Sequence, residues 1–217
     1  GQTQDQTVWL LRSNLSYAVN PDWRFVGEVN LARADTDGTD IRAAEFTEAI
    51  GGFAWRPVDN DSVNGLIRFQ YFEDLGPVGQ FTGSGQTESP KQVSKIFSAD
   101  FNFDLSEKLT LGTRYAYRGG KVSLGRNSDD FVSSDAHLAV IRLDYNVIRE
   151  WDVLAEGRAL WVEQADDLRL GALAGVYRHI GDNVKVGVGY SWSDFSDDLT
   201  DQSYSSHGPF LNILSRF

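Results

Sequence analysis

Charged side chains that could do chemistry recur at alternate positions of this chain. Arg142 and Asp144 alternate with Ile141, Leu143 and Tyr145, so in an extended strand the charged and apolar groups would point to opposite faces. Guanidinium groups bind carboxylates and phosphates through two parallel hydrogen bonds, so such a face could attract anions. It could also consist of ion pairs among its own members, because charges held away from water need partners.

The same alternation recurs in eleven segments, with the charges always on one side. We call this side the polar face and the opposite side the apolar face. Cations outnumber carboxylates on the polar face, which would suit a pore that attracts anions. A network of ion pairs among these residues is the favoured alternative, because a small barrel leaves little space inside beyond its own side chains. The residues that we expect on this face, lining an interior, are Arg12, Arg24, Glu28, Glu48, Arg56, Arg68, Asp100, Asp104, Arg114, Arg118, Arg142, Asp144, Glu156, Arg158, Arg169 and Lys185.

Acidic residues gather between the alternating segments. Cation binding, either direct or bridging to lipopolysaccharide phosphates, is one interpretation, but residues 35–40 lack the later glutamate of a calcium loop. The pattern favours solvated loop charge. These acidic residues are Asp35, Asp37, Asp40, Glu73, Asp74, Asp129, Asp130, Asp135, Asp166, Asp167, Asp194, Asp197, Asp198 and Asp201.

Enzyme signatures are missing from the sequence. The chain has no cysteine, and its three histidines, His137, His179 and His207, have no zinc-binding spacing. Gly187 and Gly189 lack the third glycine of a dinucleotide-binding loop, and the residues around Ser191 do not form a nucleophile elbow. We therefore expect no enzyme, no cofactor and no metal, and the net charge of -11 disfavours nucleic acid as a partner. A lipid hydrolase using His137 near an outer rim is the weakest alternative.

Two-residue alternation also defines the elements that hold these side chains. From Val184 to Trp192, every second residue is apolar, and no run of about 18 apolar residues forms a spanning helix. An aromatic face opposite charges in nearly every strand suits a barrel in lipid, which must be apolar outside and can be polar inside. We predict an all-β, antiparallel up-and-down transmembrane β-barrel of about twelve strands, eleven of them detected in this chain.

Tryptophan and tyrosine provide a second test, because they favour membrane interfaces. With strands that alternate in direction, they fall into two sets, one at each rim. One set is Trp9, Tyr71, Tyr117, Trp161, Tyr190 and Trp192, and the other is Tyr17, Trp23, Trp55, Tyr145, Trp151 and Phe217.

The connections sort by length in the same way. Outer-membrane barrels have short periplasmic turns and longer outer loops. The short connections that we expect are 20–22, 59–61, 106–108, 149–150 and 181–183, and the longer ones are 35–42, 74–92, 121–135, 164–167 and 194–208.

The C-terminal residues carry a family resemblance. Residues 208–217 resemble the last strand of bacterial outer-membrane proteins, although Ser215 departs from the alternation. Residues 184–199 with Phe217 resemble the C-terminal barrel of large, repeat-containing surface proteins. The resemblance implies an assembly signal at Leu211, Ile213 and Phe217, a bacterial outer-membrane location, and lipid, lipopolysaccharide and the barrel-assembly machinery as partners.

An odd number of strands has its own consequence. With Phe217 on the periplasmic side, eleven strands place Gly1 outside, whereas bacterial barrels have even strand numbers. We expect residues 1–217 to be one barrel domain, the C-terminal part of a longer precursor whose preceding segment, or a partner chain, supplies a twelfth strand. The predicted role is membrane anchor or translocator of a larger surface-exposed protein. The alternative is a narrow, passive, porin-like channel for small anionic solutes with an arginine-rich lumen.

Overall fold

Residues 6–36, 42–75, 91–123, 130–181, 183–193 and 206–215 are described by the computed structural model. These residues form strands and one short 3-10 turn, and no helix among them is long and apolar enough to cross a membrane. The elements are β1 (Gln6–Ala18), β2 (Trp23–Thr36), β3 (Arg42–Trp55), β4 (Val63–Leu75), β5 (Lys91–Ser106), β6 (Leu109–Ser123), β7 (Val132–Ser133), β8 (Ala136–Ile148), β9 (Trp151–Val162), η1 (Glu163–Ala165), β10 (Asp167–Ile180), β11 (Val184–Ser193) and β12 (Ser206–Ser215).

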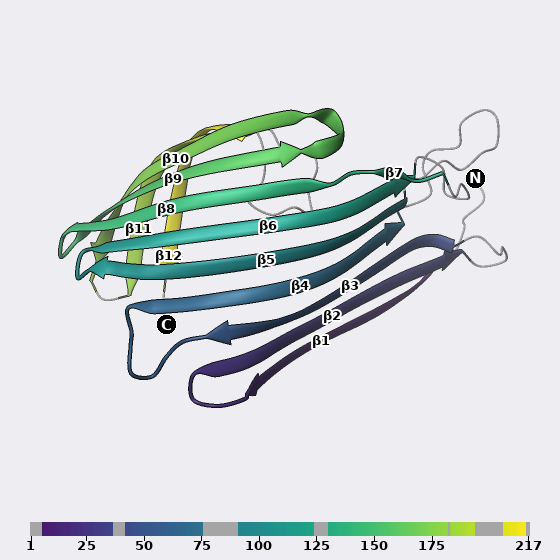
Figure 1. Cartoon of the computed structure of the whole chain (residues 1–217), viewed down its shortest axis with the longest axis horizontal. Coiled ribbons are helices and arrows are strands. Elements are labelled where there is room, and N and C mark those ends of the chain that lie inside the picture. Colours follow the sequence, from purple (N-terminus) through teal and green to yellow (C-terminus); the bar gives the residue numbers. More distant parts are fainter. Residues whose placement is uncertain are drawn as a thin grey trace. The chain divides into compact units, whose positions relative to one another are not determined.

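The strands form one sheet in which neighbours follow chain order (Figure 1). Two-residue β7 lies off this path and pairs with β6. The path therefore contains eleven strands, and they coincide with the eleven alternating segments of the sequence. The predicted all-β, antiparallel up-and-down organisation is confirmed for the described residues. A further strand contributed from outside the chain stays a prediction.

Internal contacts divide the chain into two compact units. Unit 1 consists of Gly1–Ala54, Ile67–Phe97 and Arg118–Asp135. Unit 2 consists of Trp55–Leu66, Ser98–Tyr117 and Ala136–Phe217.

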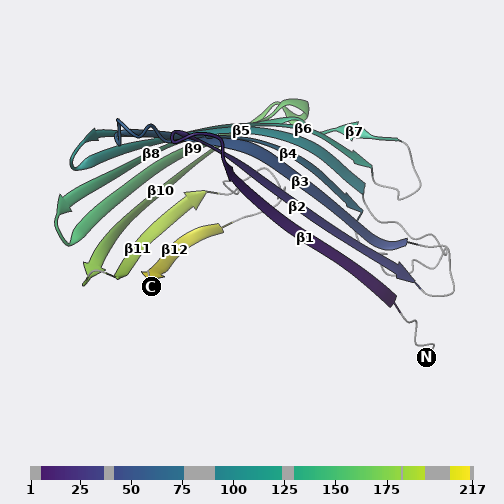
Figure 2. The ribbon, with the colours of Figure 1, turned by 90° about the horizontal axis from the view of Figure 1, so that it is seen from below.

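In unit 1, β1 and β2 form a long antiparallel hairpin (Figure 2). Its turn is closed by Asn20, whose Oδ1 accepts hydrogen bonds from the backbone N–H groups of Asp22 (3.0 Å) and Trp23 (2.8 Å). Asparagine commonly organises turns in this way. The register places Arg12 opposite Asn30, so polar side chains of the two strands share one face.

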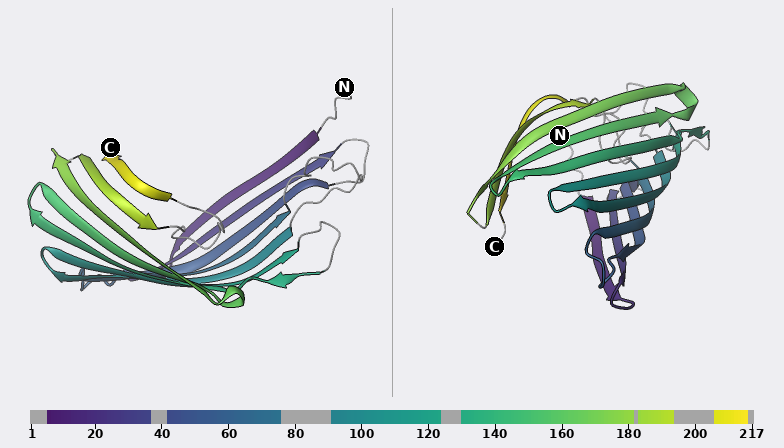
Figure 3. Two further views of the ribbon diagram at one scale, coloured as in Figure 1. Left: turned by 90° about the horizontal axis from the view of Figure 1, so that it is seen from above. Right: turned by 60° about the vertical axis from the view of Figure 1, so that its left-hand side comes forward.

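In unit 2, β8 to β12 pair in sequence as antiparallel neighbours (Figure 3). Glycines make room for aromatic rings on the polar face of these strands. A Cβ atom at Gly187 would collide with the ring of Tyr177, its cross-strand partner, and one at Gly189 would collide with the ring of Phe210. Aromatic rings that lie across glycines in this way help to fix strand register.

The short connections lie where the sequence predicts them, but one connection that was expected to be long is short. Residues 164–167 were expected in a longer loop, whereas β9 and β10 are joined tightly through η1. Asp166 adopts a left-handed conformation (φ 46°), and its backbone N–H donates to the carbonyl of Glu163 at 3.1 Å. Aspartate tolerates this conformation better than most residues, so four residues suffice to reverse the chain.

Side-chain exposure is inverted relative to a protein folded in water. Leu138 is fully buried and Arg118 is 4% exposed, and both lie on the polar face. On the apolar face, large side chains remain exposed to 71% at Leu170, 58% at Val188 and 67% at Leu211. Water-soluble domains rarely leave such a continuous apolar surface uncovered.

Candidate functional site

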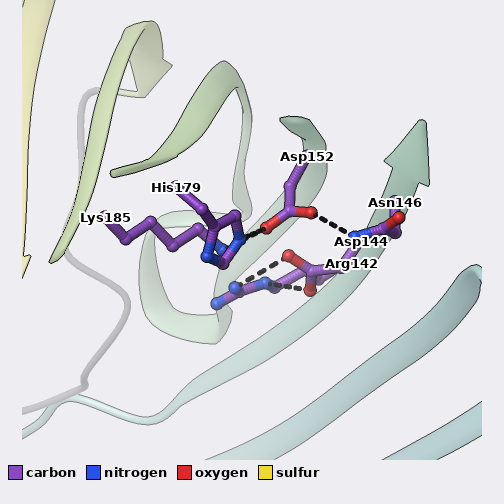
Figure 4. Close-up of polar contacts among 6 residues, drawn as sticks. All are labelled: Arg142, Asp144, Asn146, Asp152, His179 and Lys185. Atoms are coloured by element: carbon purple, nitrogen blue, oxygen red, sulfur yellow. Dashed lines mark hydrogen bonds and ion pairs between the residues drawn. The ribbon is translucent and has the colours of Figure 1, made fainter. Parts of the chain in front are cut away.

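The polar face of unit 2 holds a network centred on one carboxylate (Figure 4). Asp152 lies at the start of β9. Its Oδ2 lies 2.6 Å from Nζ of Lys185 on β11 and 2.7 Å from Nε2 of His179 on β10. Its Oδ1 accepts a hydrogen bond of 2.9 Å from Nδ2 of Asn146 on β8. A single carboxylate thus joins four consecutive strands.

Arginine–carboxylate pairs continue this network along the strands. Arg142 donates from Nε and Nη2 to the two carboxylate oxygens of Asp144, at 2.7 and 3.0 Å (Figure 4). Two residues apart on β8, both groups lie on one face, where the two-pronged geometry of guanidinium matches a carboxylate. The same spacing recurs in two pairs, Arg158 with Glu156 on β9 and Arg169 with Asp167 on β10.

A small polar pocket lies beside these pairs. Arg114 on β6 bonds Asp100 on β5, and both line a cavity of about 190 Å³ that Arg142 and Glu156 also line. Gly112 forms part of its wall, and a Cβ atom there would lie 3.1 Å from Oδ1 of Asn102. The pocket contains as many carboxylates as guanidinium groups.

In unit 1, the polar face carries a second network. Nδ2 of Asn30 donates to Glu28 (2.8 Å) and to Glu48 (2.7 Å), and Nε2 of Gln70 donates to the other oxygen of Glu48 (2.7 Å). Arg12 contacts Glu28 at 3.5 Å. Neutral amides separate the two glutamates, so this network depends on hydrogen bonds as much as on ion pairs.

Arg118 is the most deeply buried cation of the predicted polar-face set. Its Nη2 donates to the hydroxyl of Ser134 at 3.1 Å, and its Nε donates to the carbonyl of the same residue at 3.4 Å. Asp135 accepts a bond of 3.1 Å from the backbone N–H of Gly120. These bonds hold the segment after β7 against β6.

Several predicted residues lie in other surroundings than expected. Arg56 follows the end of β3 and lies in the turn, where it is 3.8 Å from Asp61 and largely exposed. Asp167, expected among solvated loop acids, is the first residue of β10 and bonds Arg169. Arg24 bonds the hydroxyl of Ser16 at 3.2 Å instead of a carboxylate.

The sequence analysis missed the residues at the centre of the network. Asp152 was not singled out, and His179 was treated as isolated. One signal in the sequence could have revealed part of the network, because opposite charges two residues apart share a face of a strand. The Glu156 and Arg158 pair follows this rule.

The two aromatic sets lie at opposite ends of the paired strands. Tyr145 pairs with Val153 near the short turn of β8 and β9, while Trp161 pairs with His137 at the other end of the same hairpin. In β1 and β2, Tyr17 pairs with Phe25 near the short turn. The sets therefore have the arrangement expected from the alternation of strand direction. On β12, Leu211 and Ile213 are exposed, and Phe217 lies outside the described residues.

His137 lies within the aromatic set at the long-connection end. Its ring stacks on Trp161, with centroids 5.2 Å apart, and lies 4.9 Å from the ring of Tyr117. Nδ1 is 2.8 Å from the hydroxyl of Tyr115, and Nε2 is 2.7 Å from the carboxylate of Glu163. Both ring nitrogens thus bond groups other than the serine that a hydrolase would require.

Metal-ligating side chains do not gather in the part of the chain that the structure describes, where no three His, Cys, Asp or Glu residues are placed to hold an ion. The acidic stretch at 35–40 lies largely outside the described residues.

Comparisons with known proteins give structural likenesses only. No protein-family model matches the chain, and no curated protein matches it. Among solved structures, the NanC porin is similar over 99% of this chain and 97% of its own, with 11% identity and a TM-score of 0.48. The β domain of the Bordetella autotransporter BrkA is similar over 87% of this chain and 84% of its own, with 14% identity and a TM-score of 0.33. At these values, neither likeness assigns a family or a function to this chain.

Proposed function

We propose that this chain is a bacterial outer-membrane β-barrel domain whose apolar face meets lipid and whose polar face points inward. The inverted exposure carries the proposal. Leu170 and Leu211 on the apolar face are 71% and 67% exposed, whereas the side chains of Glu156 and Arg158 are 10% and 13% exposed. Hydrocarbon would cover the exposed apolar side chains, and it offers no partners to charges, which the opposite face pairs internally.

The aromatic side chains support the same orientation. Trp9 and Trp161 lie toward the long connections, and Tyr17 and Tyr145 lie toward the short turns. Trp and Tyr prefer the two levels at which hydrocarbon meets water. The strands between these levels have 12 or 13 residues in β1, β8 and β9, enough to cross a bilayer at the usual tilt. The long connections would then face outward.

Within this setting we assign the chain the role of a membrane anchor or translocator for a larger surface-exposed protein. The pairing of the polar face supports this choice. Arg114, Arg142, Arg158 and Lys185 each contact a carboxylate, so these cations are already satisfied. The contacts of Arg114 with Asp100 and of Lys185 with Asp152 also tie different strands together, as the interior of a rigid anchor requires.

A narrow channel for small anionic solutes is the second candidate. The cavity of about 190 Å³ beside Arg114 and Arg142 favours it, because two guanidinium groups border open space there. A solute would have to compete with Asp100 and Asp144 for those groups. This competition makes strong, selective anion conduction the less favoured role.

Planar-bilayer recording of the refolded chain separates the two roles. An anchor with a self-paired interior gives little steady current, and the Arg142→Ala variant shows the same ion selectivity as the native chain. Arg149→Ala, in the short turn after β8, serves as the matched control. A steady, anion-selective current that falls on Arg114→Ala or Arg142→Ala, but not on Arg149→Ala, would establish the channel instead.

A further inference from the structure

Three lysines lie on the apolar face of unit 1, and two of them bond no other residue that the structure describes. Lys95 on β5 shares this face with the exposed ring of Phe97, and Lys121 lies near the end of β6. Both lysines are exposed, and neither ammonium group bonds any other residue that the structure describes. Lys91, on the same face, is different because its ammonium pairs with Glu73 at 3.1 Å.

The register of β5 and β6 brings these two lysines near each other. Gly120 lies beside Ser94, since a Cβ atom at Gly120 would be 3.4 Å from the hydroxyl of Ser94. In antiparallel strands this contact sets Lys95 opposite position 119 and Lys121 opposite position 93. The two lysines are therefore diagonal neighbours on one face, with Cα atoms about 7–8 Å apart. Position 119 is a glycine, so no side chain stands between them.

Their height along the strands coincides with one membrane boundary. Lys95 lies two residues beyond Phe97 toward the long connections, a rise of about 7 Å. Lys121 lies four residues beyond Tyr117, an aromatic residue of the rim set, a rise of about 13 Å. In the orientation proposed above, this is the level of the outer-leaflet headgroups, just outside the hydrocarbon.

We propose that Lys95 and Lys121 bind the phosphate groups of a phosphorylated glycolipid in the outer leaflet. This inference rests on the proposed membrane orientation. Two ammonium groups that bond no other described residue complement a phosphate-rich headgroup, and the exposed ring of Phe97, which lies below Lys95, can pack against its acyl chains. The glycine at 119 lets a headgroup approach the β6 backbone closely.

Reconstitution with defined lipids tests this site. The full chain is inserted into phosphatidylethanolamine vesicles containing lipid A with its phosphates, lipid A without phosphates, or phosphatidylglycerol. After gentle extraction in detergent, native mass spectrometry counts the lipids retained per protein. The variants are Lys95→Gln with Lys121→Gln and, as a matched control, Lys108→Gln in the turn at the other end of the same hairpin.

The expected result is retention of phosphorylated lipid A by the native chain and by K108Q, with about 25-fold weaker retention by the double variant, since each ammonium contributes about fivefold near a charged surface. Added salt reduces the difference because it screens the charges. Equal retention by the double variant, equal retention of lipid A without phosphates, or equal retention of phosphatidylglycerol overturns the site. A chain that inserts into none of the vesicles overturns the membrane proposal itself, a result distinguishable from insertion without selective retention.

Discussion

Nζ of Lys185 on β11 lies 2.6 Å from Oδ2 of Asp152 on β9, across the intervening strand β10. His179 on that intervening strand bonds the same carboxylate oxygen at 2.7 Å. Because the Asp152 side chain is only 15% exposed, its loss would leave three donors, Lys185, His179 and Asn146, without their acceptor. These side-chain contacts therefore connect four strands at one carboxylate, whereas each backbone ladder connects only two.

Replacing Asp152 by alanine should lower the stability of the domain. We expect a loss of about 1–3 kcal/mol, the usual cost of leaving a partly buried polar group unsatisfied. Thermal unfolding in detergent micelles, followed by circular dichroism, measures it. Asp152→Asn keeps one acceptor oxygen and the shape of the side chain and should lose less, so equal losses in the two variants would contradict a role based on hydrogen bonding.

Gly187→Val should prevent stable pairing of β10 with β11. A Cβ atom at this position collides with the ring of Tyr177, and this ring is buried, so it cannot move aside without disturbing its neighbours. We expect a cost of at least about 1–3 kcal/mol from overpacking. Folding yield after refolding into micelles is the measurement.

Gly157→Ala is the matched control for that variant. No atom lies within 4 Å of a Cβ at Gly157, so the change should stay within about 0.5 kcal/mol. A double variant of Gly187→Val with Tyr177→Ala should recover part of the folding yield. No recovery would show that the collision with the ring is not the cause.

Leu211 and Asn212 are neighbours on β12 that point to opposite faces. Leu211→Arg should destabilise the inserted domain by about 2–4 kcal/mol, the cost of arginine at the middle of a lipid-facing strand. Asn212→Arg should cost much less because it points to the polar face. Urea unfolding from lipid vesicles compares the two variants, and a larger loss for Asn212→Arg would reverse the assignment of faces.

Arg118→Leu should destabilise the segment around β7. Arg118 is almost fully buried and makes two bonds to Ser134, so the serine groups lose their donor at a cost of about 1–3 kcal/mol. Hydrogen exchange of the amides of residues 132–135 reports this loss locally. Unchanged exchange, with the surface control Arg149→Leu also unchanged, would contradict the role of Arg118.

The strands were predictable because each carries its own signal. Alternation around Ile141 and Leu143 assigns the faces of β8 without knowledge of its neighbours. Successive side chains of a strand point to opposite faces, so the apolar residues can share a face only in this way. The tight connection of β9 and β10 was not predictable in the same way, since it depends on one left-handed residue, Asp166. Nothing in the local sequence requires aspartate to adopt that conformation.

The partners of the charged residues were only partly predictable. The pair of Arg142 and Asp144 follows from their spacing within one strand. The contact of Asp152 with Lys185 depends on the register of three strands, which a single sequence does not specify. Asp152 and Asp167 add two carboxylates to the polar face and so reduce the excess of cations that the sequence suggests.

The orientation of the two faces is the central claim, and the absence of cysteine from the sequence permits a direct measurement. A single cysteine is introduced at each position from 153 to 160 on β9, spin-labelled, and reconstituted into vesicles. Electron paramagnetic resonance then compares the accessibility of each label to oxygen, which concentrates in lipid. The account predicts high oxygen accessibility at Val153, Ala155, Gly157 and Ala159 and low accessibility at Leu154, Glu156, Arg158 and Leu160. Uniform accessibility, or the reverse alternation, would contradict it.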